Sequence, residues 1–257
     1  MALHWQKEDG RIAVIALDEP DARNALTAEA RDALRAALNA LDDDPEVDAL
    51  VITGADGNFC AGGDVRTMGE SSRRAVERRM GEVARTAEAL AAFPKPVIAA
   101  IAGHVAGAGI SLACLADIVL AEDTARFTFS FLRLALGPDW GLSHTLPRRV
   151  GAAQARRLIL SAGAIDGTEA HRLGLVDILT FEGEVLQAAR ATARELAGGP
   201  RAAIAAVKGM MTDLEGLRAA LAAEAEMQKD RFPHAEHQEG AAAFRDKRKP
   251  DYTFGRG

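Results

Sequence analysis

The chain has 257 residues, of which 48% are apolar and 26% are charged, and its formal net charge is −6. This composition is typical of a globular protein with a sizeable core. The acidic balance argues against nucleic acid as a partner, because a negative surface repels phosphate backbones. No apolar run approaches the roughly 20 residues that cross a bilayer, and the first residues lack a signal-peptide pattern. We therefore expect no membrane partner and a cytoplasmic protein.

Cysteine usage agrees with a reducing compartment. Cys60 and Cys114 lie far apart, and neither belongs to a Cys/His cluster. The sequence therefore predicts no disulfide framework and no metal site.

Strands and helices alternate along most of the chain, which predicts the α/β class. Short apolar runs indicate buried strands at 12–17, 47–54, 97–103, 118–121 and 175–179. Thr27 is expected to cap a helix with one apolar stripe, and a second helix is expected over 71–93. The arginines of this second helix are expected on an exposed face: Arg73, Arg74, Arg78 and Arg79. A boundary at the Gly-Gly-Pro of 198–200 divides a core unit, 1–198, from a helical unit, 199–257.

Two segments, 47–64 and 97–116, share the pattern of a strand, a glycine-rich loop and a helix. Amides at such a helix start have no partner within the helix and favour negative charge. A dinucleotide fingerprint fails because Leu112 stands where its third glycine belongs. No phosphate-loop lysine motif is present, and "GLSHT" (141–145) lacks the last glycine of a serine nucleophile turn. The two loops therefore indicate a pair of backbone hydrogen-bond donors.

Four motifs, in order, resemble those of the enoyl-CoA hydratase/isomerase (crotonase) superfamily. They are "RNALT" (23–27), "GNFCAGGD" (57–64), "AIAGHVAGAGISLACLAD" (100–117) and "AFRDKRKPDY" (243–252). The resemblance implies a crotonase-like spiral of β-β-α units followed by a C-terminal helical trimerisation region. It also implies a homotrimer or a dimer of trimers, with a coenzyme A thioester as substrate and no further cofactor.

Position by position, the resemblance implies roles for individual residues. The amides of Gly63 and Ala108 should form an oxyanion hole for the thioester oxygen. Residues of the first motifs should contact coenzyme A: Arg23, Ala25, Leu26, Ala61 and Asp64. Phe244 and Lys247 should contact coenzyme A from the C-terminal helix, often that of a neighbouring subunit.

The proton-transfer groups depart from those of the family's hydratases. Ser111 and Phe131 stand where the resemblance places two catalytic glutamates. Asp139 remains, in "PDWG", which taken alone is typical of a turn. Several isomerases that the chain resembles carry their carboxylate at this position. Apolar neighbours such as Phe131, Leu136 and Trp140 would raise its pKa from about 3.9.

We therefore interpret the sequence as an acyl-CoA double-bond isomerase that uses Asp139 as its proton carrier. The isomerised group is a Δ3-enoyl chain or a ring-derived acyl group. Ser111, Phe131 and Trp140 are expected at the substrate, and His144 would assist only if its side chain turned inward. Two alternatives stay open: a hydratase or thioester hydrolase in which Asp139 activates water, and a non-catalytic acyl-CoA-binding protein.

Overall fold

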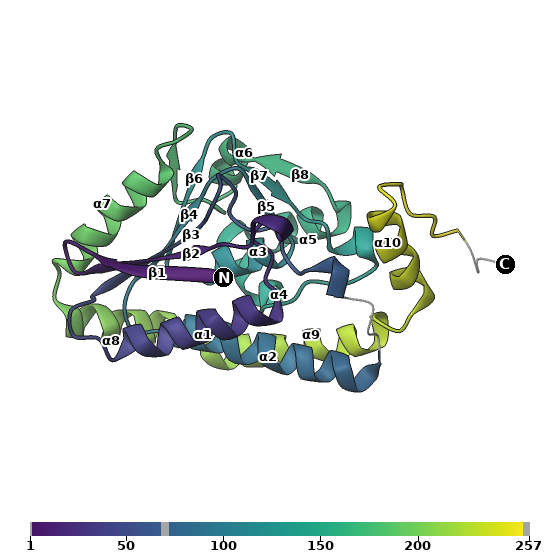
Figure 1. The fold of residues 1–257 in the computed structure, drawn as a ribbon, viewed down its shortest axis with the longest axis horizontal. Helices are drawn as coiled ribbons and strands as arrows, with labels where there is room; N and C mark the ends of the chain where they lie inside the picture. Colours follow the sequence, from purple (N-terminus) through teal and green to yellow (C-terminus); the bar gives the residue numbers. More distant parts are fainter. Residues whose placement is uncertain (1, 68–71, 254–257) are drawn as a thin grey trace.

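The computed structural model describes residues 2–67 and 72–253, and their strands form two sheets (Figure 1). The larger sheet contains, in spatial order, β1 (Leu3–Glu8), β2 (Ile12–Leu17), β3 (Ala49–Gly54), β4 (Val97–Ile101), β6 (Ile118–Glu122) and β9 (Ile178–Thr180). The smaller sheet contains β5 (His104–Ala106), β7 (Arg126–Thr128) and β8 (Ala164–Asp166). Strands adjacent in the chain thus alternate between the sheets at β4, β5, β6 and β7.

Both faces of the larger sheet are buried, which explains its nearly continuous apolar strands. β1 pairs antiparallel with β2, and the remaining neighbours in this sheet are parallel. Alternate residues point to opposite faces: Ile12 and Val14 pack against α7 (Val185–Ala197), whereas Ile15 and Leu17 belong to the main core. In Figure 1, α7 covers one face of this sheet, and α1 and α2 lie on the other side.

The helices bring the remaining apolar side chains onto this core. Before α7 they are α1 (Ala28–Asp42), α2 (Arg73–Ala92), α3 (Ala108–Cys114), α4 (Leu142–Val150), α5 (Ala152–Ser161) and α6 (Gly167–Arg172). Short 3₁₀ turns are η1 (Pro20–Ala22), η2 (Val65–Thr67) and η3 (Phe131–Leu134). The expected cap of α1 is confirmed, since the Thr27 hydroxyl accepts a hydrogen bond from the Ala30 amide at 3.1 Å. The helix expected over 71–93 is α2, although residue 71 lies outside the described residues.

Five strands differ from the sequence expectation: β9 is shifted, and β1 and the three short strands of the smaller sheet (β5, β7 and β8) were not expected. The strand expected over 175–179 is β9, which begins at Ile178 because Leu175 and Val176 are buried in the turn after α6. β1 was not expected at all, since it is an edge strand whose central residues are exposed and carry no apolar run.

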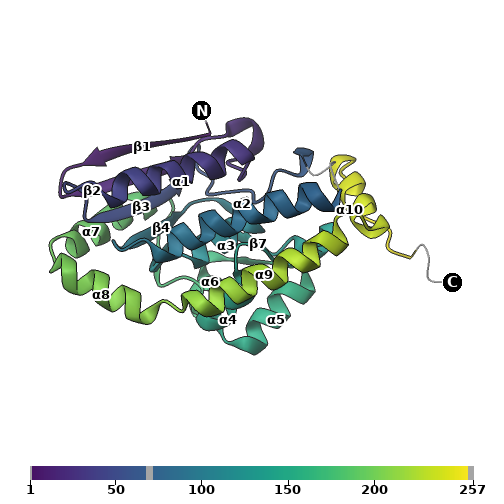
Figure 2. The same ribbon diagram turned by 90° about the horizontal axis from the view of Figure 1, so that it is seen from below.

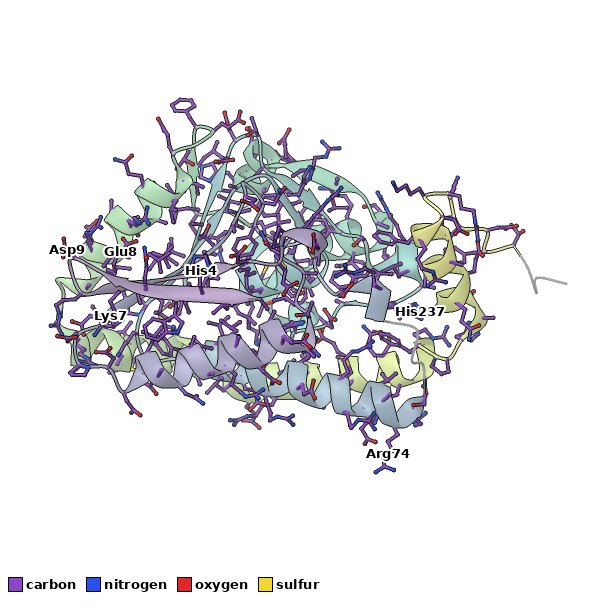
Figure 3. All side chains as sticks on the ribbon, viewed as in Figure 1. His4, Lys7, Glu8, Asp9, Arg74 and His237 are labelled. Carbon is purple, nitrogen blue, oxygen red and sulfur yellow. The ribbon has the colours of Figure 1, made fainter. Side chains whose placement is uncertain are left out.

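In the part of the chain that the structure describes, three helices follow α7 and form the predicted C-terminal helical region: α8 (Arg201–Met211), α9 (Leu214–Arg231) and α10 (Ala235–Arg245). The expected boundary falls in the short connection between α7 and α8. Figure 2 shows α9 beside α2, so this region packs back onto the core of the same chain. His237 of α10, labelled in Figure 3, is buried, and its Nδ1 lies 2.7 Å from the Leu134 carbonyl oxygen in η3. The division at residue 198 into two units stays a prediction.

Within the described residues, every helix is too short or too polar to cross a lipid bilayer.

Candidate active site

The two glycine-rich loops interlock. Cys60 and Val105 form an isolated parallel bridge, and the Ala106 amide donates to the Cys60 carbonyl oxygen at 2.9 Å. Gly62 has φ +93°, and a side chain there would overlap the Ala106 carbonyl oxygen. Gly109 similarly has no room for a side chain beside the Cys60 carbonyl oxygen. Glycine is therefore required where the loops meet, and this close approach places Gly63 and Ala108 at one cavity.

That cavity, of about 40 Å³, lies between the two loops, α1, α2 and the segment before α4. Most of its lining is apolar, and its charged residues come from four separate segments. The lining consists of Leu26, Arg31, Gly63, Asp64, Arg79, Met80, Val83, Ala108, Leu136, Asp139, Trp140 and Phe232. The amides of Gly63 and Ala108 donate no hydrogen bond to another atom of residues 2–67 and 72–253. Two backbone donors therefore border the cavity with hydrogen-bonding capacity to spare.

Asp139 meets these donors across the cavity. It lies between η3 and α4, and its residue is half-buried. Its Oδ1 is shielded from solvent and has no hydrogen-bond partner among the described residues. A carboxylate that merely shaped a turn would bond to nearby backbone amides through its oxygens. The Oδ1 atom instead lacks such a bond, and its residue lines the cavity.

Burial is the main reason that the pKa of Asp139 rises, from its ordinary 3.8 to about 7. The negative charge of Glu224 raises this pKa further, whereas the positive charges of Arg31 and Arg79 oppose the rise. A carboxylate with such a pKa is matched to proton transfer near neutral pH. The arrangement can therefore stabilise a developing oxyanion and move a proton beside it.

Two of the residues expected at coenzyme A, Leu26 and Asp64, also line this cavity, as does Trp140, which was expected at the substrate. The other residues of the first two motifs that were expected at coenzyme A lie close to them in the chain and do not line the cavity. Arg23 is exposed, and its carbonyl oxygen accepts a hydrogen bond from the Ala61 amide at 3.0 Å. Ala25 is buried in the same turn. The structure thus brings the first two motifs together at the mouth of the two loops.

The remaining expected residues lie outside the cavity lining. Ser111 is fully buried in α3, and Phe131 is buried in η3, close to the backbone of Gly107. Phe244 is 61% exposed at the end of α10, and Lys247 follows it on the surface. Within one chain, these two C-terminal residues do not line the cavity that holds Asp139.

Several residues at the site were missed from the sequence. Arg73, Arg74 and Arg78 are exposed as expected, but the expectation was wrong for Arg79, which turns inward and lines the cavity. Its guanidinium lies 5.1 Å from the centre of the Phe232 ring. The helical period places Arg79 on the same side of α2 as Val76 and Met80, a signal that the cluster of arginines obscured.

Arg31 and Glu224 carried no usable sequence signal, because each is a single charge in an ordinary helix. Arg31 is buried, donates to the Leu26 carbonyl oxygen at 2.9 Å and pairs with Glu82 at 3.2 Å. His144 does not line the cavity; its Nε2 lies 3.7 Å from Asp213.

Comparison with known proteins finds the family that the four sequence motifs resemble, and the match extends over nearly the whole chain. The family model described as "Enoyl-CoA hydratase/isomerase" matches residues 7–254. A "Probable enoyl-CoA hydratase" of Rhodobacter capsulatus is 38% identical over 247 residues, covering 94% of each chain. A "Probable enoyl-CoA hydratase echA8" of Mycobacterium bovis is 35% identical over 251 residues, covering 96% of each chain.

Solved structures agree in fold. A crystal structure of an enoyl-CoA hydratase from Mycobacterium avium subsp. paratuberculosis has a TM-score of 0.88 at 30% identity, covering 98% of this chain and 99% of that one. The expected crotonase-like α/β fold with its C-terminal helices is thereby confirmed. The chain belongs to the enoyl-CoA hydratase/isomerase family of the crotonase superfamily, and is an enzyme of that family.

Proposed function

We propose that the chain is an acyl-CoA double-bond isomerase acting on a Δ3-enoyl or ring-derived acyl-CoA thioester. One observation carries this proposal: Asp139, with its pKa raised to about 7, lines the same cavity as the amides of Gly63 and Ala108. A proton carrier and two oxyanion donors are the groups that double-bond migration needs.

The reaction follows from these three groups. The amides of Gly63 and Ala108 hold the thioester oxygen, and ionised Asp139 removes a proton from the α-carbon of a 3-enoyl group. The electron pair delocalises over the dienolate, whose negative charge lies mainly on the oxygen in the hole. Protonated Asp139 then returns the proton to the γ-carbon, which leaves the 2-enoyl product and regenerates the carboxylate. No water is consumed and no second acid is required.

The two positions at which the resemblance places the glutamates of water addition carry no carboxylate. Phe131 has no proton chemistry, and the Ser111 hydroxyl is fully buried without a hydrogen-bond partner among the described residues. Apolar side chains also dominate the cavity that holds Asp139. These features favour proton return over attack by water.

A hydratase in which Asp139 activates water is the second candidate. It is favoured by the relatives, several of which are described as hydratases, including the "Crotonyl-CoA hydratase" of Syntrophomonas wolfei at 33% identity. In that case the same carboxylate would take a proton from water, and the oxyanion hole would keep its role.

Coenzyme A would lie along the first loop, with Arg23 offering positive charge to its phosphates. Phe244 and Lys247 are exposed, in keeping with contacts to coenzyme A bound by a neighbouring copy. A homotrimer, or a dimer of trimers, would bring them to such a site.

The test is incubation of the protein with a 3-enoyl-CoA in deuterated water, followed by mass spectrometry of the acyl group. The expected result is a 2-enoyl product with deuterium at the α- or γ-carbon, and the loss of both in Asp139→Asn. A mass gain of one water would instead identify a hydratase. Binding of the thioester without exchange, unchanged in Asp139→Asn, would contradict a catalytic role for Asp139.

A further inference from the structure

Helix α9 holds the segment that carries Asp139 by two buried polar side chains. Glu224 and Gln228 lie one turn apart on α9 and are 4% and 1% exposed. The Gln228 Nε2 donates to the Gly137 carbonyl oxygen at 3.0 Å, before Asp139 in the chain. The Glu224 carboxylate accepts from the Gly141 and Ser143 amides, at 2.7 and 2.9 Å, after Asp139. The two side chains thus grip the segment on both sides of Asp139.

The backbone of this segment needs such support. Trp140 has φ +57° and Gly141 has φ +76°, both in the left-handed region, which is unfavourable for a tryptophan. α4 begins directly after them, so its first amides have no partner within the helix. Glu224 satisfies two amides in this turn with charge-assisted bonds. The carboxylate therefore stabilises the turn that directs Asp139 into the cavity.

Apolar packing from the same helix leaves the turn little freedom. A side chain at Gly137 would overlap the Met227 methyl group, and one at Gly141 would overlap Leu217. α9 therefore contacts the segment at both of its glycines. Neither Glu224 nor Gln228 lines the cavity, so their effect on a bound substrate passes through the segment that they hold, which brings Asp139 and Trp140 to the cavity.

Charge gives Glu224 a second influence on Asp139. Four elements bring charged groups to this carboxyl: Arg31 from α1, Arg79 from α2, Asp64 from the first loop and Glu224 from α9. Arg31 is paired with Glu82, and Asp64 is paired with Arg66 at 2.9 Å. The negative charge of Glu224 raises the pKa of Asp139, and the two arginines lower it.

We propose that Glu224 and Gln228 are positioning residues: a polar clamp from the C-terminal helical region that fixes Asp139 in the cavity. This inference rests on the proposed function, in which Asp139 carries the proton. The clamp also links the helical region to the chemistry, since its two residues lie more than 80 positions along the chain from the segment they hold.

The test compares three variants of α9: Glu224→Gln, Gln228→Leu and, as a matched control, Glu226→Gln. Glu226 is an exposed carboxylate on the same helix that pairs with Lys229 and not with the Asp139 segment. The first readout is the titration of Asp139 by carbon NMR of protein labelled at its aspartate carboxyl carbons. The signal is assigned by its loss in Asp139→Asn. The second readout is the pH profile of kcat for double-bond migration.

Glu224→Gln should lower the pKa of Asp139 and shift the acid limb of kcat to lower pH by the same interval. Gln228→Leu removes no charge, so it should lower kcat at its optimum by about tenfold, equivalent to about 1.4 kcal/mol of barrier, and leave KM nearly unchanged. Glu226→Gln should match the wild type in both readouts. Circular dichroism and coenzyme A binding establish that each variant is folded.

The inference is overturned if Asp139 titrates in folded Glu224→Gln as it does in Glu226→Gln. It is also overturned if folded Gln228→Leu keeps full kcat. A Glu224→Gln variant that does not fold leaves Gln228→Leu to decide the matter. Because the NMR titration needs no turnover, absent isomerase activity would contradict the proposed function alone.

Discussion

Replacing Asp139 by asparagine should stabilise the protein at alkaline pH. In the folded chain the pKa of this carboxyl is raised from 3.8 to about 7, so ionisation costs more free energy there than in the unfolded chain. The wild type should therefore lose stability as the pH rises from the unfolded pKa to the folded pKa, with the full loss present above it. Asparagine does not ionise and avoids this loss.

The magnitude follows from the two pKa values. A tenfold change in an acid dissociation constant corresponds to about 1.4 kcal/mol, so the full loss is at most about 4 kcal/mol. Part of it is already present at pH 5, where the unfolded carboxyl is ionised and the folded one is protonated. Between pH 5 and pH 8, the free energy of unfolding of Asp139→Asn relative to wild type should rise by about 2–3 kcal/mol.

The assay is urea unfolding of both proteins at pH 5, 6, 7 and 8, followed by tryptophan fluorescence at one protein concentration. Glu239→Gln is the control, because its carboxyl has a lowered pKa: the Arg248 side chain brings the pKa of Glu239 to about 2. Glu239 is ionised throughout this range, so its variant should differ from wild type by a nearly constant amount. If the advantage of Asp139→Asn is equally constant, the pKa of Asp139 is not raised, and Asp139 is not a base matched to neutral pH.

Three further predictions concern the same site and the C-terminal helices. Ala108→Pro removes the amide of one oxyanion donor, at the first position of α3, where a helix tolerates proline. The kcat for double-bond migration should therefore fall by about 100- to 1,000-fold. Ala108→Gly keeps the amide and should keep most of the activity. Arg79→Met removes a positive charge that lowers the pKa of Asp139, so the acid limb of kcat should move to higher pH, and a profile that stays in place would contradict this. Light scattering should find the proposed trimer or dimer of trimers. Met210 and Met211 are 84% and 81% exposed on α8, so glutamate at both positions should shift the protein to smaller species if they lie in a subunit interface.

Local signals in the sequence were sufficient to predict the main strands and helices, the two glycine loops and the fold. The apolar run of β2 and the Thr27 cap of α1 depend on neighbours within a few residues, and the structure confirms both. The two glycine loops were also readable, because tight backbone approach permits few residue types. Together with the first and last of the four motifs, in this order along the chain, they identified the family, and with it the fold.

Tertiary structure decided the electrostatics of the site. "PDWG" is equally suited to an inert turn, and the pKa of Asp139 is raised by burial and by the charge of Glu224, both of which require the folded chain. Glu224 and Arg79 set this pKa in opposite directions, yet each is an ordinary charged residue of a helix in the sequence. Hydrophobic period and capping act over a few residues and can be read locally. Burial and the charges around a carboxyl are set by segments far apart in the chain, so they exist only once the chain has folded.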